Sequence, residues 1–281
     1  MNPVKRAAKT LLNATVGPAR TGRVGDQYAD KRTAAAYRMT HAGRDSARRL
    51  AALKNRYRGE RCVIIGNGPS LKNMNLSPLR DEYTFGLNRI YLLFERLGFS
   101  TTFFVSVNRY VLEQCADEIR DVPGMKFISW SARAWVPPDD DVVYLRSTLG
   151  PRFCTEPPSQ GVWEGATVTY VAMQLAYYLG FEQVILIGVD HSFTSKGLAH
   201  QLVTSTGDDP NHFDPSYFGE GFRWQLPDLA QSEVAYRLAR SQFQLAGREI
   251  VDATVGGKLD VFPKVNYDLL FPTKRATERP A

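Results

Sequence analysis

The chain has 281 residues, of which 43% are hydrophobic and 11% aromatic, enough for one sizeable core and unlike the composition of a disordered protein. No apolar run reaches the roughly 18 residues needed to cross a bilayer, and the N-terminus leads into no continuous apolar signal-peptide core, so we expect a cytoplasmic protein. The three widely spaced cysteines indicate neither a disulfide framework nor a zinc site. The net charge of +6 comes from residues 1–61, with fifteen lysines and arginines against four acids, whereas residues 62–281 hold twenty against twenty-five, which disfavours a nucleic-acid-binding fold.

Residues 1–58 form a basic segment that we expect to be helical in part and otherwise disordered. Within it, residues 4–12 carry apolar side chains at helical spacing with lysine and arginine around them. This pattern would suit peripheral binding to the anionic inner face of the cell membrane, and a solvated tail without a partner is the alternative. Residues 46–58 predict an amphipathic helix that leads into the first strand.

Residues 59–262 predict one nucleotide-binding α/β domain, followed by a C-terminal tail over 263–281. Short apolar runs alternate with helical patterns, which is typical of a Rossmann-like, mostly parallel sheet with helices on both faces. The predicted strands span residues 62–65, 83–86, 102–107, 126–129, 142–145, 183–187 and 249–251. The predicted helices span residues 90–97, 111–120, 167–179 and 232–245. Residues 194–229 are polar and have no period, which indicates a lid-like loop near the C-terminus.

Small and neutral polar residues follow four of the predicted strands. They are Gly66-Asn67-Gly68, Asn88, Asn108 and Gly188-Val189-Asp190-His191. Ligands of open parallel sheets bind beyond the carboxyl ends of the strands, so these residues predict a nucleotide site. In the segment Gly66-Asn67-Gly68-Pro69-Ser70, the glycines would let backbone N–H groups approach a phosphate, and a helix beginning near Ser70 would add its positive end.

Two common nucleotide-binding motifs do not fit this loop. The third glycine of the dinucleotide fingerprint is replaced by Leu71, and Asn88 stands where an NAD-binding protein would carry an acid. Lys72 does not have the spacing of a phosphate-binding P-loop lysine. The acidic run at 139–141 directly precedes a strand, at the wrong strand end for a ligand, and predicts a turn rather than a metal site.

The loop 66–71, the two later asparagines and the helix-strand unit 179–190 resemble the bacterial sialyltransferases of glycosyltransferase family 42. They equally resemble the MptE-like (domain of unknown function 115) proteins, which include an archaeal pterin pyrophosphokinase and motility-associated flagellin glycosyltransferases. The stretch 251–257, Val-Asp-Ala-Thr-Val-Gly-Gly, looks more like the MptE-like branch. The resemblance covers about residues 60–260 and implies a nucleotide-binding Rossmann-like domain.

By this resemblance, Asn67, Asn88 and Asn108 would contact the nucleotide of a CMP-sugar donor, and residues 188–190 would line its base. The late polar segment would supply a tyrosine on the phosphate, here Tyr217, and the general base. Thr167 stands at the N-terminus of the apolar helix predicted over 167–179, where it would cap the helix, approach a phosphate, or do both.

The identity of the general base stays open between three residues. Glu220 stands where the base of the resembled sialyltransferases would align, although those enzymes use a histidine. His212 in the lid-like loop and His191 at a strand end are the alternatives, because histidine titrates near neutral pH without perturbation. Asp190 would orient His191, bind a ribose hydroxyl or cap a turn.

The resemblance implies a metal-independent glycosyltransferase that moves a nonulosonic-acid-type sugar from a CMP donor to a glycan or lipid-linked acceptor, with no cofactor. One alternative is a pyrophosphokinase that uses ATP and magnesium on a pterin-like alcohol. Another is a non-catalytic nucleotide-binding module. The sequence does not predict the sugar, the acceptor, the linkage or the oligomeric state, and a homo-oligomer is compatible with it.

Overall fold

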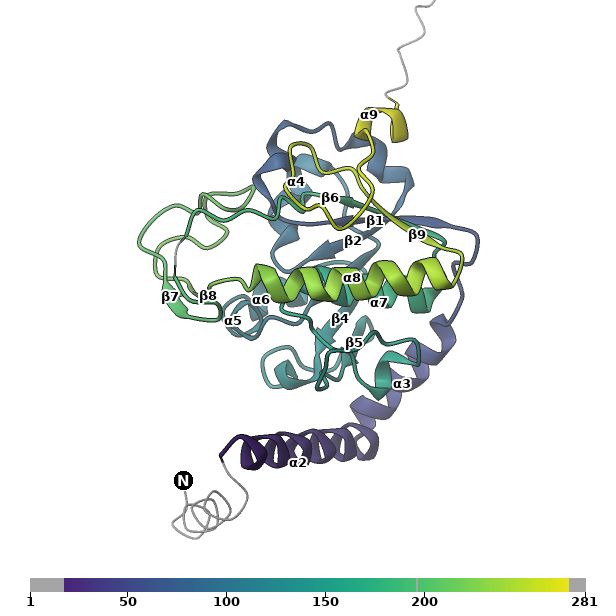
Figure 1. Ribbon diagram of the computed structural model, residues 1–281, viewed down its shortest axis with the longest axis vertical. Helices are drawn as coiled ribbons and strands as arrows, with labels where there is room; N and C mark the ends of the chain where they lie inside the picture. The colour runs from purple at the N-terminus through teal and green to yellow at the C-terminus, as the bar shows by residue number, and fades with distance from the viewer. Residues whose placement is uncertain (1–17, 196, 273–281) are drawn as a thin grey trace, which may run out of the picture.

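The computed structural model describes residues 18–195 and 197–272. Its centre is a seven-stranded sheet in which every pair of neighbouring strands is parallel (Figure 1). This confirms the Rossmann-like α/β fold, and each predicted strand is present to within one residue at either end. In the order of the sheet, the strands are β5 (Val142–Leu145), β4 (Met125–Ser129), β3 (Phe103–Ser106), β2 (Tyr83–Leu87), β1 (Arg61–Ile65), β6 (Gln183–Ile187) and β9 (Glu249–Asp252).

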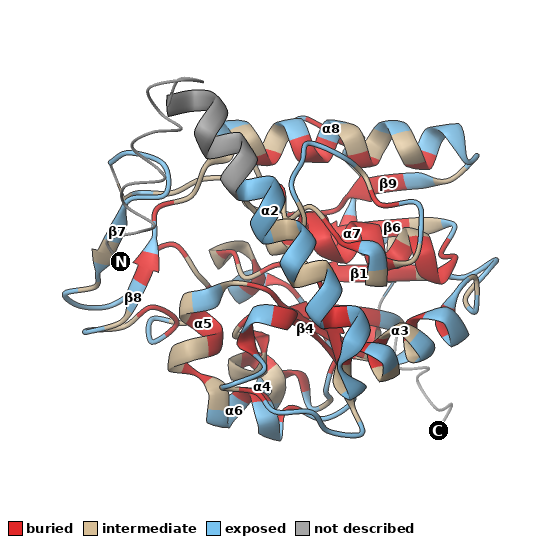
Figure 2. Cartoon of the chain, turned by 90° about the horizontal axis from the view of Figure 1, so that it is seen from below, coloured by how far each residue is buried: buried red, intermediate tan, exposed pale blue. Residues whose placement is uncertain are grey.

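Helices cover both faces of the sheet, and the buried residues lie between the layers (Figure 2). Successive side chains of a strand point to opposite faces, so each central strand is apolar on both sides. In β1, Cys62 and Ile64 belong to the core on one face, whereas Val63 and Ile65 belong to the core on the other. The first face is covered by α3 (His41–Leu53), α7 (Val168–Leu179) and α8 (Leu229–Leu245), and the second by α4 (Phe94–Leu97), α5 (Arg109–Gln114) and α6 (Ala116–Asp121).

The first turn of helix α7 lies at the carboxyl edge of the strands and contributes residues to the site. The Thr167 hydroxyl caps it by accepting from the Thr169 N–H (3.3 Å). The helix ends at Gly180, whose φ of 102° is the left-handed conformation that favours glycine. Ten of its twelve residues are buried, which explains a nearly continuous apolar sequence without a polar face.

Four predicted segments differ in detail from the structure. The amphipathic helix predicted over residues 46–58 is α3, which begins at His41 and ends at Leu53. The helix predicted over residues 111–120 is two short helices, α5 and α6, because the backbone of Cys115 leaves the helical region (φ −123°, ψ 29°). The helix predicted over 90–97 begins as a 3₁₀ turn, Ile90–Leu93, and becomes α-helical only at α4. The lid-like loop 194–229 contains an antiparallel pair, β7 (Leu202–Thr204) and β8 (Arg223–Gln225), whose strands are too short to show a period.

Residues on the far side of both predicted domain boundaries, at 58/59 and 262/263, pack against the sheet domain. Leu50 and Leu53 of α3 lie in the same core as the sheet, and the Tyr37 hydroxyl of α2 (Pro18–Met39) donates to the carbonyl oxygen of Tyr144 (2.8 Å). Residues 37–53 therefore belong with the sheet although they precede residue 59. In the predicted tail, the buried Tyr267 donates its hydroxyl to the Asn75 carbonyl oxygen (2.8 Å).

The apolar stripe predicted at residues 4–12 lies outside the described residues. Within the described ranges, no helix combines the length and the apolar content that crossing a membrane requires.

Candidate active site

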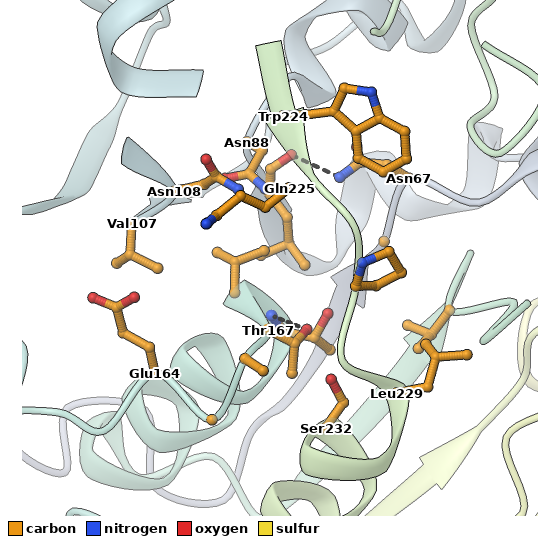
Figure 3. A pocket seen from close by; sticks show the side chains of 18 of the residues that line it. Asn67, Asn88, Val107, Asn108, Glu164, Thr167, Trp224, Gln225, Leu229 and Ser232 are labelled. Carbon is orange, nitrogen blue, oxygen red and sulfur yellow. Dashed lines mark hydrogen bonds between the residues drawn. The ribbon is translucent and has the colours of Figure 1, made fainter. Parts of the chain in front are cut away.

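A cavity lies at the carboxyl ends of β1 and β6. These strands are neighbours, but the chain runs from β1 towards β5 on one side and from β6 towards β9 on the other. Ligands of open α/β sheets bind at such a reversal of strand order. The cavity has a volume of about 680 Å³ and is lined by the loops after β1, β2, β3 and β6, by the start of α7 and by the lid residues 200–227 (Figure 3).

Most residues predicted for the site line this cavity. They are Gly66, Asn67, Gly68, Asn88, Asn108, Thr167, Gly188, Val189, Asp190, His191, His212 and Tyr217. Three others do not line it: Pro69, Ser70 and Glu220, the last of which is exposed on the lid. The placement of Glu220 removes its carboxylate from the set of groups that can reach a ligand in this cavity.

The two glycines after β1 allow close packing against the loop after β6. A Cβ on Gly66 would lie 2.2 Å from the carbonyl oxygen of Gly188, and one on Gly68 would lie 1.7 Å from a carboxylate oxygen of Asp190. The N–H of Gly66 donates to Ile187 (2.8 Å) and the N–H of Gly68 to Gly188 (2.8 Å). The prediction that these glycine N–H groups hold a phosphate is therefore wrong, because both groups already have protein acceptors.

Asp190 occupies the end of the 3₁₀ helix Pro69–Asn73, where an anion was expected. Its carboxylate accepts from the Ser70 N–H (3.0 Å) and the Ser70 hydroxyl (2.7 Å). Burial raises the pKa of Asp190, and the bonds from Ser70 offset part of that rise. Ser70 and Asp190 therefore join the two loops, and the predicted helix end at Ser70 is not free to hold a phosphate.

Residues of the stretch 251–257 form hydrogen bonds that hold the loop after β6. The Thr254 hydroxyl accepts from the Val189 N–H (3.2 Å), and the N–H of Lys258 donates to the Asp190 carbonyl oxygen (2.9 Å). The Asp252 side chain is fully buried and pairs with Lys264 (2.7 Å). This sequence pattern therefore holds Val189 and Asp190 at the floor of the cavity.

The three asparagines keep part of their hydrogen-bonding capacity for a ligand. The Nδ2 of Asn67 donates to the Leu87 carbonyl oxygen (3.0 Å), while its buried Oδ1 has no partner among the described residues. The Oδ1 of Asn88 accepts from the Ser106 hydroxyl (3.1 Å), and the Oδ1 of Asn108 caps α5. A buried amide oxygen without a partner is costly, so Asn67 is the least satisfied of the three asparagines.

Backbone strain is concentrated around this cavity. Among the described residues other than glycine, positive φ angles occur at Asn55, Asn88, Ala166, His191 and His200, and all but Asn55 line the cavity. Such conformations cost free energy and persist at functional sites where the surrounding structure enforces them. The distribution supports the cavity as the functional site independently of the sequence motifs.

His212 and Asp209 form a hydrogen-bonded dyad on the lid. The Nδ1 of His212 lies 2.6 Å from the Oδ2 of Asp209, and Nε2 has no partner among the described residues. Burial acts to raise the pKa of Asp209, but the bond from His212 and the N–H groups of Asn211 and Phe218 outweigh it, so the pKa is lowered. An ionised Asp209 holds the proton on Nδ1 and leaves the Nε2 lone pair free to accept a proton.

The lid is attached to the sheet so that this dyad faces the cavity. The N–H of Phe213 donates to the Asn67 carbonyl oxygen (2.9 Å), which places His212 beside the β1 loop. The imidazole ring stacks on the Tyr217 ring, with centroids 4.0 Å apart. Arg89, directly after Asn88, donates through Nη1 to the carbonyl oxygens of Ser216 and Tyr217. Sequence reasoning missed Arg89 because its partners lie about 128 positions away.

His191 also lines the cavity and forms a second histidine–carboxylate pair. Its Nε2 lies 3.2 Å from the Oε1 of Glu233 on α8, and Arg237 contacts the other oxygen of that carboxylate (2.7 Å). The bond from His191, which outweighs a small effect of burial, lowers the pKa of Glu233. Each histidine thus has one ring nitrogen on a carboxylate and the other without a partner among the described residues. They differ in the carboxylate, because Asp209 is buried whereas Glu233 is partly exposed and shared with Arg237.

Glu164 is a cavity residue that sequence reasoning did not select. It lies just before α7, in the segment Trp163-Glu164-Gly165-Ala166-Thr167, and the Ser147 hydroxyl donates to its carboxyl group. The sequence signal that could have selected Glu164 is its position next to a glycine and directly before the helix that follows the fifth strand. Within the described part of the chain, no three histidine, cysteine or acidic side chains gather closely enough to hold a metal ion.

Comparison with known proteins places the chain in a family. Among solved structures, it is similar to "Structure of MAf glycosyltransferase from Magnetospirillum magneticum AMB-1", with 15% identity and a TM-score of 0.48 over 81% of this chain and 39% of that one. The chain thus spans about two fifths of that protein's length. No curated protein matches the chain. The sequence model described as "6-hydroxymethylpterin diphosphokinase MptE-like" matches residues 39–196, more than half of the chain, which therefore belongs to the MptE-like family.

Proposed function

We propose that this chain is a glycosyltransferase that moves a nonulosonic-acid-type sugar from a CMP donor to a hydroxyl group of a glycan or lipid-linked acceptor. The observation that carries the proposal is the His212–Asp209 dyad, whose histidine lines the cavity at the switch point of the sheet. A base of this kind is suited to deprotonating an acceptor hydroxyl near neutral pH.

The transfer needs one proton movement. As the acceptor oxygen bonds to the anomeric carbon, its proton passes to Nε2 of His212, and Asp209 stabilises the resulting imidazolium. The bond between the anomeric carbon and the phosphate oxygen breaks, and CMP leaves with the electron pair. Attack opposite to the leaving phosphate inverts the anomeric centre.

The charges around the cavity favour a donor with one phosphate. Apart from histidines, Arg109 is the only cationic side chain among the described residues that line it, and Glu164, Asp190 and the nearby Asp209 are acidic. A triphosphate would bring more negative charge than these groups neutralise. The nucleotide would lie along Asn67, Asn88 and the β6 loop, with Thr167 and Tyr217 near the phosphate.

A pyrophosphokinase acting on a pterin-like alcohol is the second candidate, because the family's description names a pterin diphosphokinase. Its chemistry also needs a base for a hydroxyl group, so the dyad suits it. Magnesium is usually held by one or two carboxylates together with substrate phosphates, and Glu164 is the carboxyl group that would serve here. The charge of the cavity makes this the weaker candidate.

A ligand panel separates the candidates. The purified full chain would be titrated by calorimetry with CMP, CDP, UDP, ATP and NAD, with and without magnesium. We expect metal-independent binding of CMP, and binding only of ATP with magnesium would refute the transferase in favour of the kinase. Binding of no nucleotide would refute both and favour a non-catalytic module. His212→Ala should then abolish transfer while it leaves CMP affinity unchanged.

The acceptor side of the proposal includes the membrane. The basic N-terminal segment beside an acidic catalytic body would suit an enzyme that works on lipid-linked acceptors at the inner face of the cell membrane. Co-sedimentation with vesicles containing phosphatidylglycerol, compared with neutral vesicles, tests this part, and equal binding to both would contradict it.

A further inference from the structure

Glu164 is a carboxyl group of the cavity that the proposed transfer step does not use. It is half-buried, and its Oε1 accepts from the Ser147 hydroxyl. No lysine or arginine forms an ion pair with it among the described residues. Burial raises the pKa of Glu164, and the Ser147 bond offsets only part of the rise. The second carboxyl oxygen has no hydrogen-bond partner among the described residues.

Glu164 lies away from Asn67 and the loop after β1. Figure 3 shows it on the opposite side of the cavity from Asn67 and Trp224, with its carboxyl group turned towards Val107. The nucleotide, placed along Asn67 and the β6 loop, leaves this side of the cavity for the group that the nucleotide carries.

We propose that Glu164 is a specificity-determining residue that accepts hydrogen bonds from hydroxyl groups of the transferred sugar. The inference rests on the proposed function. A desolvated carboxyl group with one donor gains most from a ligand that brings further donors, and vicinal sugar hydroxyls are such donors. The sugar carboxylate faces away from Glu164, because two negative charges in a water-poor cavity repel each other.

The contact makes a prediction that separates sugar from nucleotide. CMP alone does not reach Glu164, whereas a complete CMP-linked sugar does. Removal of the carboxyl group should therefore weaken binding of the complete donor about tenfold to hundredfold and leave CMP unaffected. Glutamine keeps one acceptor oxygen, so Glu164→Gln should lose less affinity than Glu164→Ala.

The experiment measures dissociation constants of CMP and of CMP-N-acetylneuraminate for the full chain, the two Glu164 variants and the control Glu156→Gln. Glu156 is exposed and lies outside the cavity, so its variant should bind both ligands as the wild type does. Unchanged CMP affinity shows that each variant is folded.

Three results would overturn the inference: equal weakening of both ligands, no weakening of either, or a wild type that binds the two ligands equally. Failure of the wild type to bind CMP would instead refute the proposed function. If Glu164→Ala no longer binds CMP, the test rests on Glu164→Gln alone. Wild-type binding of both ligands by Glu164→Gln would then contradict the sugar contact.

Discussion

Asp209→Asn tests the dyad at its most sensitive atom. The Oδ2 of Asp209 accepts from His212 (2.6 Å) and from the Phe218 N–H (3.1 Å), and Oδ1 accepts from the Asn211 N–H (2.8 Å). If the asparagine oxygen keeps the bond to Asn211, its NH₂ group faces two donors. The imidazole must then move its proton to Nε2, which removes the base.

The magnitude follows from these three bonds. Loss of the charge-assisted bond to His212 costs about 1.5–3 kcal/mol, and the buried Phe218 N–H left without an acceptor costs about 1–3 kcal/mol more. Urea unfolding should therefore show a loss of stability on the order of 3 kcal/mol. Removal of a general base lowers turnover by about 10²- to 10⁴-fold. The affinity for CMP should stay within about twofold, because the dyad does not hold the nucleotide.

The matched control is Asp208→Asn, which changes an exposed neighbour of the same charge. It should leave both turnover and stability near the wild-type values. The assay is transfer from CMP-N-acetylneuraminate at saturating donor, with CMP affinity measured separately. Wild-type turnover in Asp209→Asn would refute the assignment of His212 as the base, and so would equal losses in the two variants.

The stability difference between wild type and Asp209→Asn should depend on pH. The pKa of Asp209 is lowered from its usual value of 3.8, because hydrogen bonds from His212 and the backbone outweigh the effect of burial. A lowered pKa contributes stability that is fully present above 3.8 and is lost as the pH falls through the folded-state value. The difference should therefore shrink in acid, and a difference that grows there would contradict the ionised carboxylate.

Further variants test the packing and the alternatives. Gly68→Ala should destabilise the protein by about 1–3 kcal/mol in a urea titration, because its Cβ would lie 1.7 Å from a carboxylate oxygen of the β6 loop. In the control Gly207→Ala, the Cβ meets nothing within 4 Å, so this variant should be neutral or slightly stabilising. Arg89→Met removes the bonds that attach the lid, so limited proteolysis within residues 204–226 should be about tenfold faster or more, and an unchanged rate would deny Arg89 this role. His191→Gln should keep turnover, and a loss as large as that of His212→Ala would make His191 the base.

Much of the fold could be predicted because its strands are local apolar runs. In β1 and β6, four of five residues are fully buried, so the sequence is hydrophobic without alternation and the strand is evident within a short window. The asparagines and His191 could be selected because they follow strands, and the carboxyl ends of parallel strands meet at one edge. The division of the 111–120 helix at Cys115 was not visible, because no proline or glycine marks it.

The roles within the site depended on pairs of residues far apart in the chain. Sequence alone determined that Gly66 and Gly68 follow a strand, and a phosphate cradle was a reasonable prediction for their N–H groups. Only the tertiary structure decided that Ile187 and Gly188 accept those N–H groups and that the Asp190 carboxylate bonds to Ser70, 120 positions earlier. A backbone donor is available to a ligand only if no neighbouring strand or loop satisfies it first, and that neighbour is set by the packing of the whole sheet.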